Sequence, residues 1–121
     1  MADVTIKNSS YSTVAMIDSG TIKNGSYSTI GYIYEDGTVK DSSYSTIGYV
    51  RDDGSVQNGS HSTIGHWSID RITDGSYSTL WNINSSGSIT NSNYSTVGQL
   101  EGNWKENIKA VVAYLFFFSE L

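Results

Sequence analysis

A triplet of hydroxyl and aromatic residues, Tyr-Ser-Thr or once His-Ser-Thr, recurs six times in this 121-residue chain and is its most regular source of binding chemistry. The triplets begin at Tyr11, Tyr27, Tyr44, His61, Tyr77 and Tyr94. Aromatic rings offer flat faces to sugar rings and threonines offer hydroxyls, so repeated rows of both would suit a repetitive ligand such as a glycan. Aromatic and hydroxyl pairs also stabilise a pleated surface, which gives the same rows a purely structural explanation.

The candidate ligand face consists of the first and third residues of each triplet. These residues are Tyr11, Thr13, Tyr27, Thr29, Tyr44, Thr46, His61, Thr63, Tyr77, Thr79, Tyr94 and Thr96. An ice-binding face would need paired threonines on each tier, and here Tyr and Ser intervene. The sequence therefore leaves a structural ladder and a glycan-binding face as the two interpretations of these rows.

Two histidines are the remaining candidates for metal or catalytic chemistry. His61 and His66 are five residues apart, and with Asp70 nearby they could hold a metal ion opportunistically. Catalysis would require a nucleophile and an orienting acid that converge on a histidine, and no such constellation is visible. We therefore expect no catalytic residues, no dedicated metal site and no cofactor, and we expect that the protein is not an enzyme.

Acidic turns resemble calcium loops only superficially. Asp36, Asp52 and Asp53 stand beside glycines, but no D-x-D-x-D-G run is present. Carboxylates that cap solvent-exposed turns are the expected interpretation. The glycines recur singly, so a phosphate-binding loop is not expected either.

Composition excludes several classes of protein. The net charge of -5 and the scattered distribution of seven Lys and Arg residues argue against binding to nucleic acid. There is no Cys, so neither a disulfide framework nor a thiolate zinc site is possible. The longest apolar run, residues 110–118, is too short for a transmembrane helix. The start, residues 1–8, lacks the basic and apolar regions of a secretion signal, which predicts a cytoplasmic location.

Three apolar columns define a repeat of 16 or 17 residues, since successive triplets are 16, 17, 17, 16 and 17 residues apart. The first column is Ile6, Ile22, Val39, Val56, Ile72 and Ile89. The second is Val14, Ile30, Ile47, Ile64, Leu80 and Val97. The third is Ile17, Ile33, Val50, Trp67, Ile83 and Leu100. These spacings predict two short strands in each unit, with all three columns in one shared interior.

Glycines and Asx residues mark the points at which each unit bends. A glycine or another small or aromatic residue follows the second column, and the three-residue spacing to the third column predicts a bulge or a corner there. Turns such as Glu35-Asp36-Gly37 suit a type I turn with a left-handed glycine. The opposite turns begin at Asn8, Asn24, Asp41, Asn58, Asp74 and Asn91, whose side chains can bond the backbone two residues later.

An all-β fold follows, with two possible architectures. We expect a short β-solenoid of six two-strand repeats, because stacked coils need the same corner residues in every tier. An antiparallel β-meander of hairpins is the alternative, since the turns also suit hairpins. A closed twelve-stranded barrel is not expected, because these small side chains would not fill its interior. The predicted repeat domain covers residues 1–102.

The pattern ends at Leu100, and residues 103–121 are expected to form a hydrophobic helical cap of the same domain. Asn103 and Glu106 have the spacing of a capping box, which predicts a helix start. The cap is expected to cover the open end of the stack. Three consecutive aromatic residues cannot all face inward from such a cap, so Phe116, Phe117 and Phe118 are candidates for self-association into a homo-oligomer.

A resemblance supports the repeat assignment. Units such as DGTVKDSSYSTIGYVRDDG (residues 36–54), followed by AVVAYLFFF (residues 110–118), resemble a group of uncharacterised short bacterial repeat proteins. That group carries tandem DGTI-x-NSSYSTIGYI units and a Phe-rich C-terminus. The resemblance implies a bacterial source and no activity. We therefore expect a non-catalytic structural or protein-interaction module, with a glycan- or surface-binding module as the alternative.

Overall fold

The computed structural model describes residues 3–119, in which twelve β-strands precede one α-helix. The strands are β1 (Val4–Asn8), β2 (Thr13–Asp18), β3 (Thr21–Asn24), β4 (Thr29–Ile33), β5 (Thr38–Asp41), β6 (Thr46–Val50), β7 (Ser55–Asn58), β8 (Thr63–Trp67), β9 (Arg71–Asp74), β10 (Thr79–Ile83), β11 (Ser88–Asn91) and β12 (Thr96–Gly102). The helix is α1 (Ile108–Phe117). The ends of the predicted domain and cap, residues 1–2 and 120–121, lie outside the described residues.

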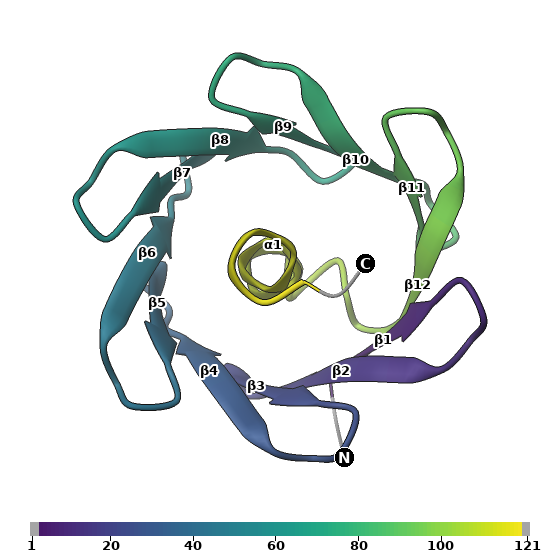
Figure 1. The fold of residues 1–121 in the computed structure, drawn as a ribbon, viewed down its shortest axis with the longest axis horizontal. Helices are drawn as coiled ribbons and strands as arrows, with labels where there is room; N and C mark the ends of the chain where they lie inside the picture. Colours follow the sequence, from purple (N-terminus) through teal and green to yellow (C-terminus); the bar gives the residue numbers. More distant parts are fainter. Residues whose placement is uncertain (1–2, 120–121) are drawn as a thin grey trace.

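The sheet is a closed antiparallel barrel. Each strand pairs with its neighbours in sequence, and β1 also pairs with β12 (Figure 1). In this closing pair Ile6 lies opposite Leu100. Each repeat is one hairpin, and the six hairpins stand side by side around a ring. The predicted β-solenoid is therefore wrong, and the hairpin alternative is confirmed in a closed form. Both connections of each unit are tight reversals, which join antiparallel neighbours and not the parallel coils of a solenoid.

The three apolar columns share one interior, as predicted. All six residues of the first column are fully buried. The third column contributes Ile17, Val50, Ile83 and Leu100 to the same core, while Ile33 and Trp67 are partly buried against it. The second column is half-buried, and all of its residues except Leu80 are packed against this core. A shared core therefore links all six units.

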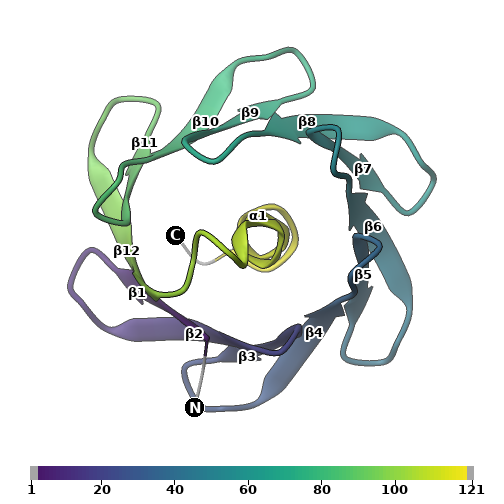
Figure 2. The same cartoon turned by 180° about the vertical axis from the view of Figure 1, so that it is seen from behind.

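Helix α1 fills the middle of the barrel. It lies inside the ring of strands in both views of the molecule (Figures 1 and 2). Its buried residues are Ala110, Val111, Val112, Ala113, Tyr114 and Leu115. A helix that is surrounded by a wall can be apolar on every side, because every direction leads to the core. The chain thus supplies from its own C-terminal segment the side chains that the strands lack.

The predicted cap is consequently wrong in its position. A closed barrel has no open sheet edge for a lid to cover. The objection to a twelve-stranded barrel assumed that only strand side chains would fill it, and α1 removes that objection. Hydrophobic side chains of the helix and of the strands belong to one cluster.

The helix also begins later than the capping-box spacing predicts. The helix starts at Ile108, and Asn107 occupies the N-cap position without a side-chain capping hydrogen bond. The Asn107 amide instead donates to the carbonyl of Asn103, at 2.9 Å. Trp104 is almost completely buried and anchors the segment that enters the barrel. No helix within residues 3–119 has the length and apolar character needed to span a membrane.

Three glycines of the wall receive the three C-terminal Phe rings. The ring of Phe118 contacts Gly31 in β4, that of Phe117 contacts Gly48 in β6, and that of Phe116 contacts Gly65 in β8. A Cβ atom at any of these glycines would collide with the facing ring. The inference that three consecutive Phe residues cannot all face inward is therefore wrong, because the wall surrounds the helix.

A bulge occurs in every unit, one residue before its predicted position. In the second hairpin Ile22 lies opposite Gly31 and Lys23 lies opposite Thr29, so Ile30 of the second column is the extra residue. The glycine of this unit has no positive φ. Because no positive φ is required there, Ala15 and Trp81 can occupy the same position in other units. The glycine of this unit leaves space for the Phe118 ring.

Candidate functional site

Six loops project outward from the barrel wall and carry the first two residues of each repeated triplet (Figure 1). We call them the outer loops; they are residues 8–12, 24–28, 41–45, 58–62, 74–78 and 91–95. In the second loop the N–H of Tyr27 donates to the carbonyl of Asn24 at 3.0 Å, and the N–H of Asn24 donates to the carbonyl of Ser28 at 2.9 Å. This is a type I turn followed by a residue in the left-handed region, an arrangement that closes three-residue hairpin loops.

An Asx side chain holds each outer loop, as predicted. In the second loop Asn24 Oδ1 accepts hydrogen bonds from the N–H groups of Ser26 and Ser28, at 2.8 and 3.1 Å. The same two bonds recur at the other five Asx residues. All six loops therefore have one conformation.

The aromatic residue of each triplet adopts positive φ, which the sequence analysis did not predict. The φ angles are 64° at Tyr11, 67° at Tyr27, 66° at Tyr44, 65° at His61, 69° at Tyr77 and 65° at Tyr94. Left-handed backbone is uncommon for a bulky side chain. The spacing within the turns could have indicated it. In the opposite turn Gly37 lies three residues after Tyr34 and has φ 93°, and Tyr27 lies at the same distance after Asn24.

The continuous rows expected from a stacked coil are not formed. The aromatic residues lie in loops and not in strands, and each triplet threonine is the first residue of an even-numbered strand. Equivalent threonines are separated by an intervening strand, which places them roughly 9–10 Å apart. The twelve predicted residues therefore lie at one end of the hairpins as a ring of separate clusters.

Three loop aromatics stack on a neighbouring unit. Each partner directly follows one of the three wall glycines, Gly31, Gly48 or Gly65. The stacked pairs are Tyr32 with Tyr44 at 4.7 Å between centroids, Tyr49 with His61 at 4.5 Å, and His66 with Tyr77 at 4.0 Å. These contacts join unlike positions of adjacent units, so they are not the ladder of identical residues that the sequence suggested.

The aromatic stacks have an electrostatic component. The adjacent Tyr44 side chain, by hydrogen bonding, raises the pKa of the Tyr32 phenol above its usual value. The Arg51 guanidinium lies 5.0 Å from the centre of the Tyr49 ring, which also stacks on His61. A cation over an aromatic face is attracted by the ring quadrupole, so this contact adds to the stack.

The candidate metal residues are not brought together. His61 and His66 stack on different tyrosines, Tyr49 and Tyr77. Asp70 lies in the turn at the other end of the hairpins and accepts a hydrogen bond from Ser68 Oγ at 2.9 Å. Within residues 3–119 no group of three or more His, Cys, Asp or Glu side chains is arranged to hold a metal ion.

The acidic turn residues cap backbone groups of their own turns. Asp36 Oδ1 accepts from the N–H of Thr38 at 3.0 Å, and this bond lowers the pKa of Asp36. Asp53 Oδ1 accepts from the hydroxyl and the N–H of Ser55, at 2.7 and 3.0 Å, and the hydroxyl bond is the main cause of its lowered pKa. Hydrogen bonds to a carboxylate favour its charged form.

The residues predicted for self-association have partners inside the barrel. Phe116, Phe117 and Phe118 are half-buried, and their rings contact Gly65, Gly48 and Gly31. Self-association was expected because the three rings could not all face inward, and these contacts remove that reason. Association of copies stays a prediction.

Replacing Tyr94 by Gly is expected to raise the free energy of unfolding by roughly 0.5–1 kcal/mol, because glycine adopts positive φ without steric cost. Tyr94 is 79% exposed. Tyr44→Gly is the matched comparison, since it relieves the same backbone but loses the stack on Tyr32, and it is expected to give no gain. Urea unfolding measures both. Equal increases in the free energy of unfolding of the two variants would show that the stack of Tyr44 on Tyr32 does not contribute to stability.

Comparison with known proteins gives one result. A family model described as "5-fold beta-flower protein" matches residues 3–118, which is nearly the whole chain. Neither the curated proteins nor the solved structures that were searched yielded a match. The description names a fivefold arrangement, whereas this chain forms six hairpins around its ring. Because the match extends over all six repeats and the helix, the chain belongs to the 5-fold beta-flower family.

Proposed function

We propose that this protein is a non-catalytic interaction module whose contact surface is the ring of outer loops. The observation that supports this proposal is the exposure of five loop tyrosines, which are 60–79% accessible although their backbone is in an unfavourable region. Tyrosine is enriched at protein interfaces because a large rigid ring gives contact area at low entropic cost. Unfavourable backbone that recurs at one position in six loops motivates a functional hypothesis.

The rigid barrel supports this function physically. Two N–H groups of each loop donate to the Asx side chain at the end of the preceding strand, so a partner would meet pre-ordered side chains. Pre-ordering lowers the entropic cost of binding. Six similar loops on one ring would also bind a repetitive partner in a multivalent way.

Binding of a glycan is the second candidate. Tyr11, Tyr27 and Tyr94 stack on no other aromatic ring within residues 3–119, and Tyr27 and Tyr94 are 72% and 79% exposed. Free faces of this kind are the surfaces on which sugar rings stack.

The triple variant Tyr11→Asn, Tyr27→Asn and Tyr94→Asn tests both candidates. Asn tolerates positive φ, so the variant is expected to keep the fold, which circular dichroism checks.

Static light scattering over a concentration series is expected to show that the wild-type chain associates and that the triple variant is a monomer. Association that persists in the variant would exclude Tyr11, Tyr27 and Tyr94 as the contact. A glycan-array signal that only the wild type gives would support the second candidate. A wild-type chain that stays monomeric and binds no glycan contradicts both.

A further inference from the structure

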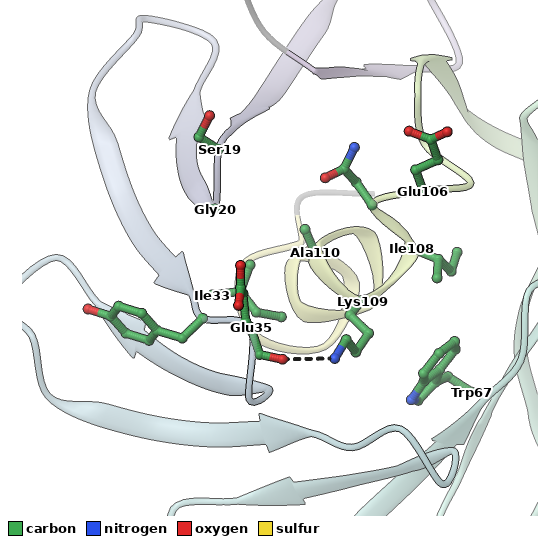
Figure 3. A pocket seen from close by; sticks show the side chains of 11 residues that line it. Ser19, Gly20, Ile33, Glu35, Trp67, Glu106, Ile108, Lys109 and Ala110 are labelled. Carbon is green, nitrogen blue, oxygen red and sulfur yellow. Dashed lines mark hydrogen bonds between the residues drawn. The ribbon is translucent and has the colours of Figure 1, made fainter.

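A pocket of about 470 Å³ lies at the end of the barrel where the chain enters to form α1. We call this end the mouth. Figure 3 shows the pocket between the first turn of the helix and the wall, with Lys109 projecting between Glu35 and Trp67. Its volume falls within the range of small-molecule sites.

The pocket lies beside one of the two shortened turns of the repeat. The 16-residue units end in the turns at Ser19-Gly20 and Ser68-Asp70, one residue shorter than the others. Ser19 and Gly20 line this pocket, and a second pocket of about 450 Å³ is lined by Ile69 and Asp70. Each of the two shortened turns therefore borders a pocket, and the two turns are three units apart in a ring of six.

Apolar and aromatic side chains form the body of the pocket. Ile33, Ile108 and Trp67 line it. Trp67 replaces the aliphatic residue that the third column has in other units. Its ring is fixed, since Nε1 donates to the carbonyl of Arg51 at 2.8 Å. Among aromatic side chains, indole has the strongest attraction for a cation over its face.

Carboxylates dominate the charge around the pocket. The Lys109 ammonium is already bound, 2.7 Å from Asp52 Oδ1 and 3.2 Å from the carbonyl of Glu35. The side chains of Glu35 and Glu106 form no ion pair within residues 3–119. Nine of the eleven acidic residues in that range lie at the mouth: Asp3, Asp18, Glu35, Asp36, Asp52, Asp53, Asp70, Glu101 and Glu106. Arg51, Arg71, Lys105 and Lys109 lie at the same end, so the excess charge there is negative, and an excess of one sign attracts ligands of the other sign.

The second pocket has the same combination of apolar side chains, an indole and a carboxylate. It joins Ile69 and Ile83 to the indole of Trp104 and the carboxylate of Asp70. The ammonium of Lys105 lies 5.6 Å from the Trp104 ring centre. Here the chain supplies its own cation to an indole beside a carboxylate.

We infer that the pocket at Trp67 binds a small organic cation, an ammonium group on an apolar body. The apolar body lies against Ile33 and Ile108, and the ammonium lies over the Trp67 indole, while the carboxylates of Glu35 and Glu106 add negative charge to the lining of the same pocket. This inference is independent of the outer loops, which are at the opposite end of the hairpins.

Three probes of similar shape test the head-group charge: phenethylammonium, phenethyl alcohol and phenylacetate. Chemical-shift titration of the full chain is expected to show phenethylammonium binding at one site, with a dissociation constant of about 1 mM or below. The alcohol is expected to bind at least fivefold more weakly, and the acetate not at all. Equal binding of ammonium and alcohol, or no binding of the ammonium up to about 10 mM, overturns the inference.

Matched variants locate the site. Trp67→Leu copies Leu100 of the sixth unit and is expected to abolish phenethylammonium binding. Glu35→Gln with Glu106→Gln is expected to weaken it about fivefold, in keeping with exposed charge pairs. The control, Asp36→Asn with Asp53→Asn, removes the same charge from the mouth outside the pocket and keeps the Asx acceptors. Thermal melting checks that each variant is folded. Retained binding in folded Trp67→Leu, or equal weakening by both charge pairs, contradicts the assignment.

Discussion

Ending the chain at Gly102 is expected to abolish the folded barrel. The deletion removes α1, whose residues Val111, Val112, Tyr114 and Leu115 are 0–2% exposed. Truncating one such side chain to Ala costs about 2–5 kcal/mol, whereas a domain of this size is stable by about 5–15 kcal/mol. The loss of the whole helix therefore exceeds the stability available. Circular dichroism is expected to show no cooperative thermal transition.

The control is Leu115→Ala in the full chain. It removes one buried side chain and leaves the helix in place, so it is expected to lower the free energy of unfolding by about 2–5 kcal/mol and keep a cooperative transition. A truncated chain that is soluble and melts sharply would contradict the role of α1 as the centre of the core.

Gly48→Ala is expected to destabilise the protein by about 1–3 kcal/mol, the usual cost of overpacking a core. The added Cβ would meet the ring of Phe117 on one side and the carbonyl oxygen of Gln57, 2.6 Å away, on the other. Ala has a better strand propensity than Gly, so a loss of stability would identify a steric cause. Urea unfolding measures the change.

A double-mutant cycle isolates the contact. Phe117→Leu shortens the facing side chain, so Gly48→Ala is expected to cost less in that background, with a coupling of about 0.5–3 kcal/mol. Gly59→Ala is the matched control: its Cβ would lie 3.4 Å from the nearest atom, the Thr46 carbonyl oxygen, and a change within about 0.5 kcal/mol is expected. Identical costs of Gly48→Ala in both backgrounds would exclude the ring as the cause.

The two pockets and the outer loops lie at opposite ends of the hairpins. The loops carry exposed rings at one end of every hairpin, and the mouth carries most of the carboxylates at the other. A partner at the loops and a cation at the mouth would therefore occupy separate surfaces. The tests proposed for each use substitutions that do not touch the other.

Local features were determined by the sequence alone. The six units, the buried first column and the Asx bonds at residues such as Asn24 follow from residue type and short spacing. The left-handed glycines at Gly37, Gly54 and Gly87 follow in the same way. Each of these depends on interactions within about one hairpin, which the order of residues specifies directly.

Only the tertiary structure decided how the units are arranged. Coils and hairpins satisfy the same apolar columns, and the choice depends on what fills the interior. Tyr114 and Leu115 fill it from a segment distant in sequence from most of the wall. The contacts of Phe117 with Gly48 and of Tyr32 with Tyr44 likewise exist only once the ring is closed around the helix. Periodicity within a unit contains no information about such partners, because they are set by closure of the barrel and the volume it encloses.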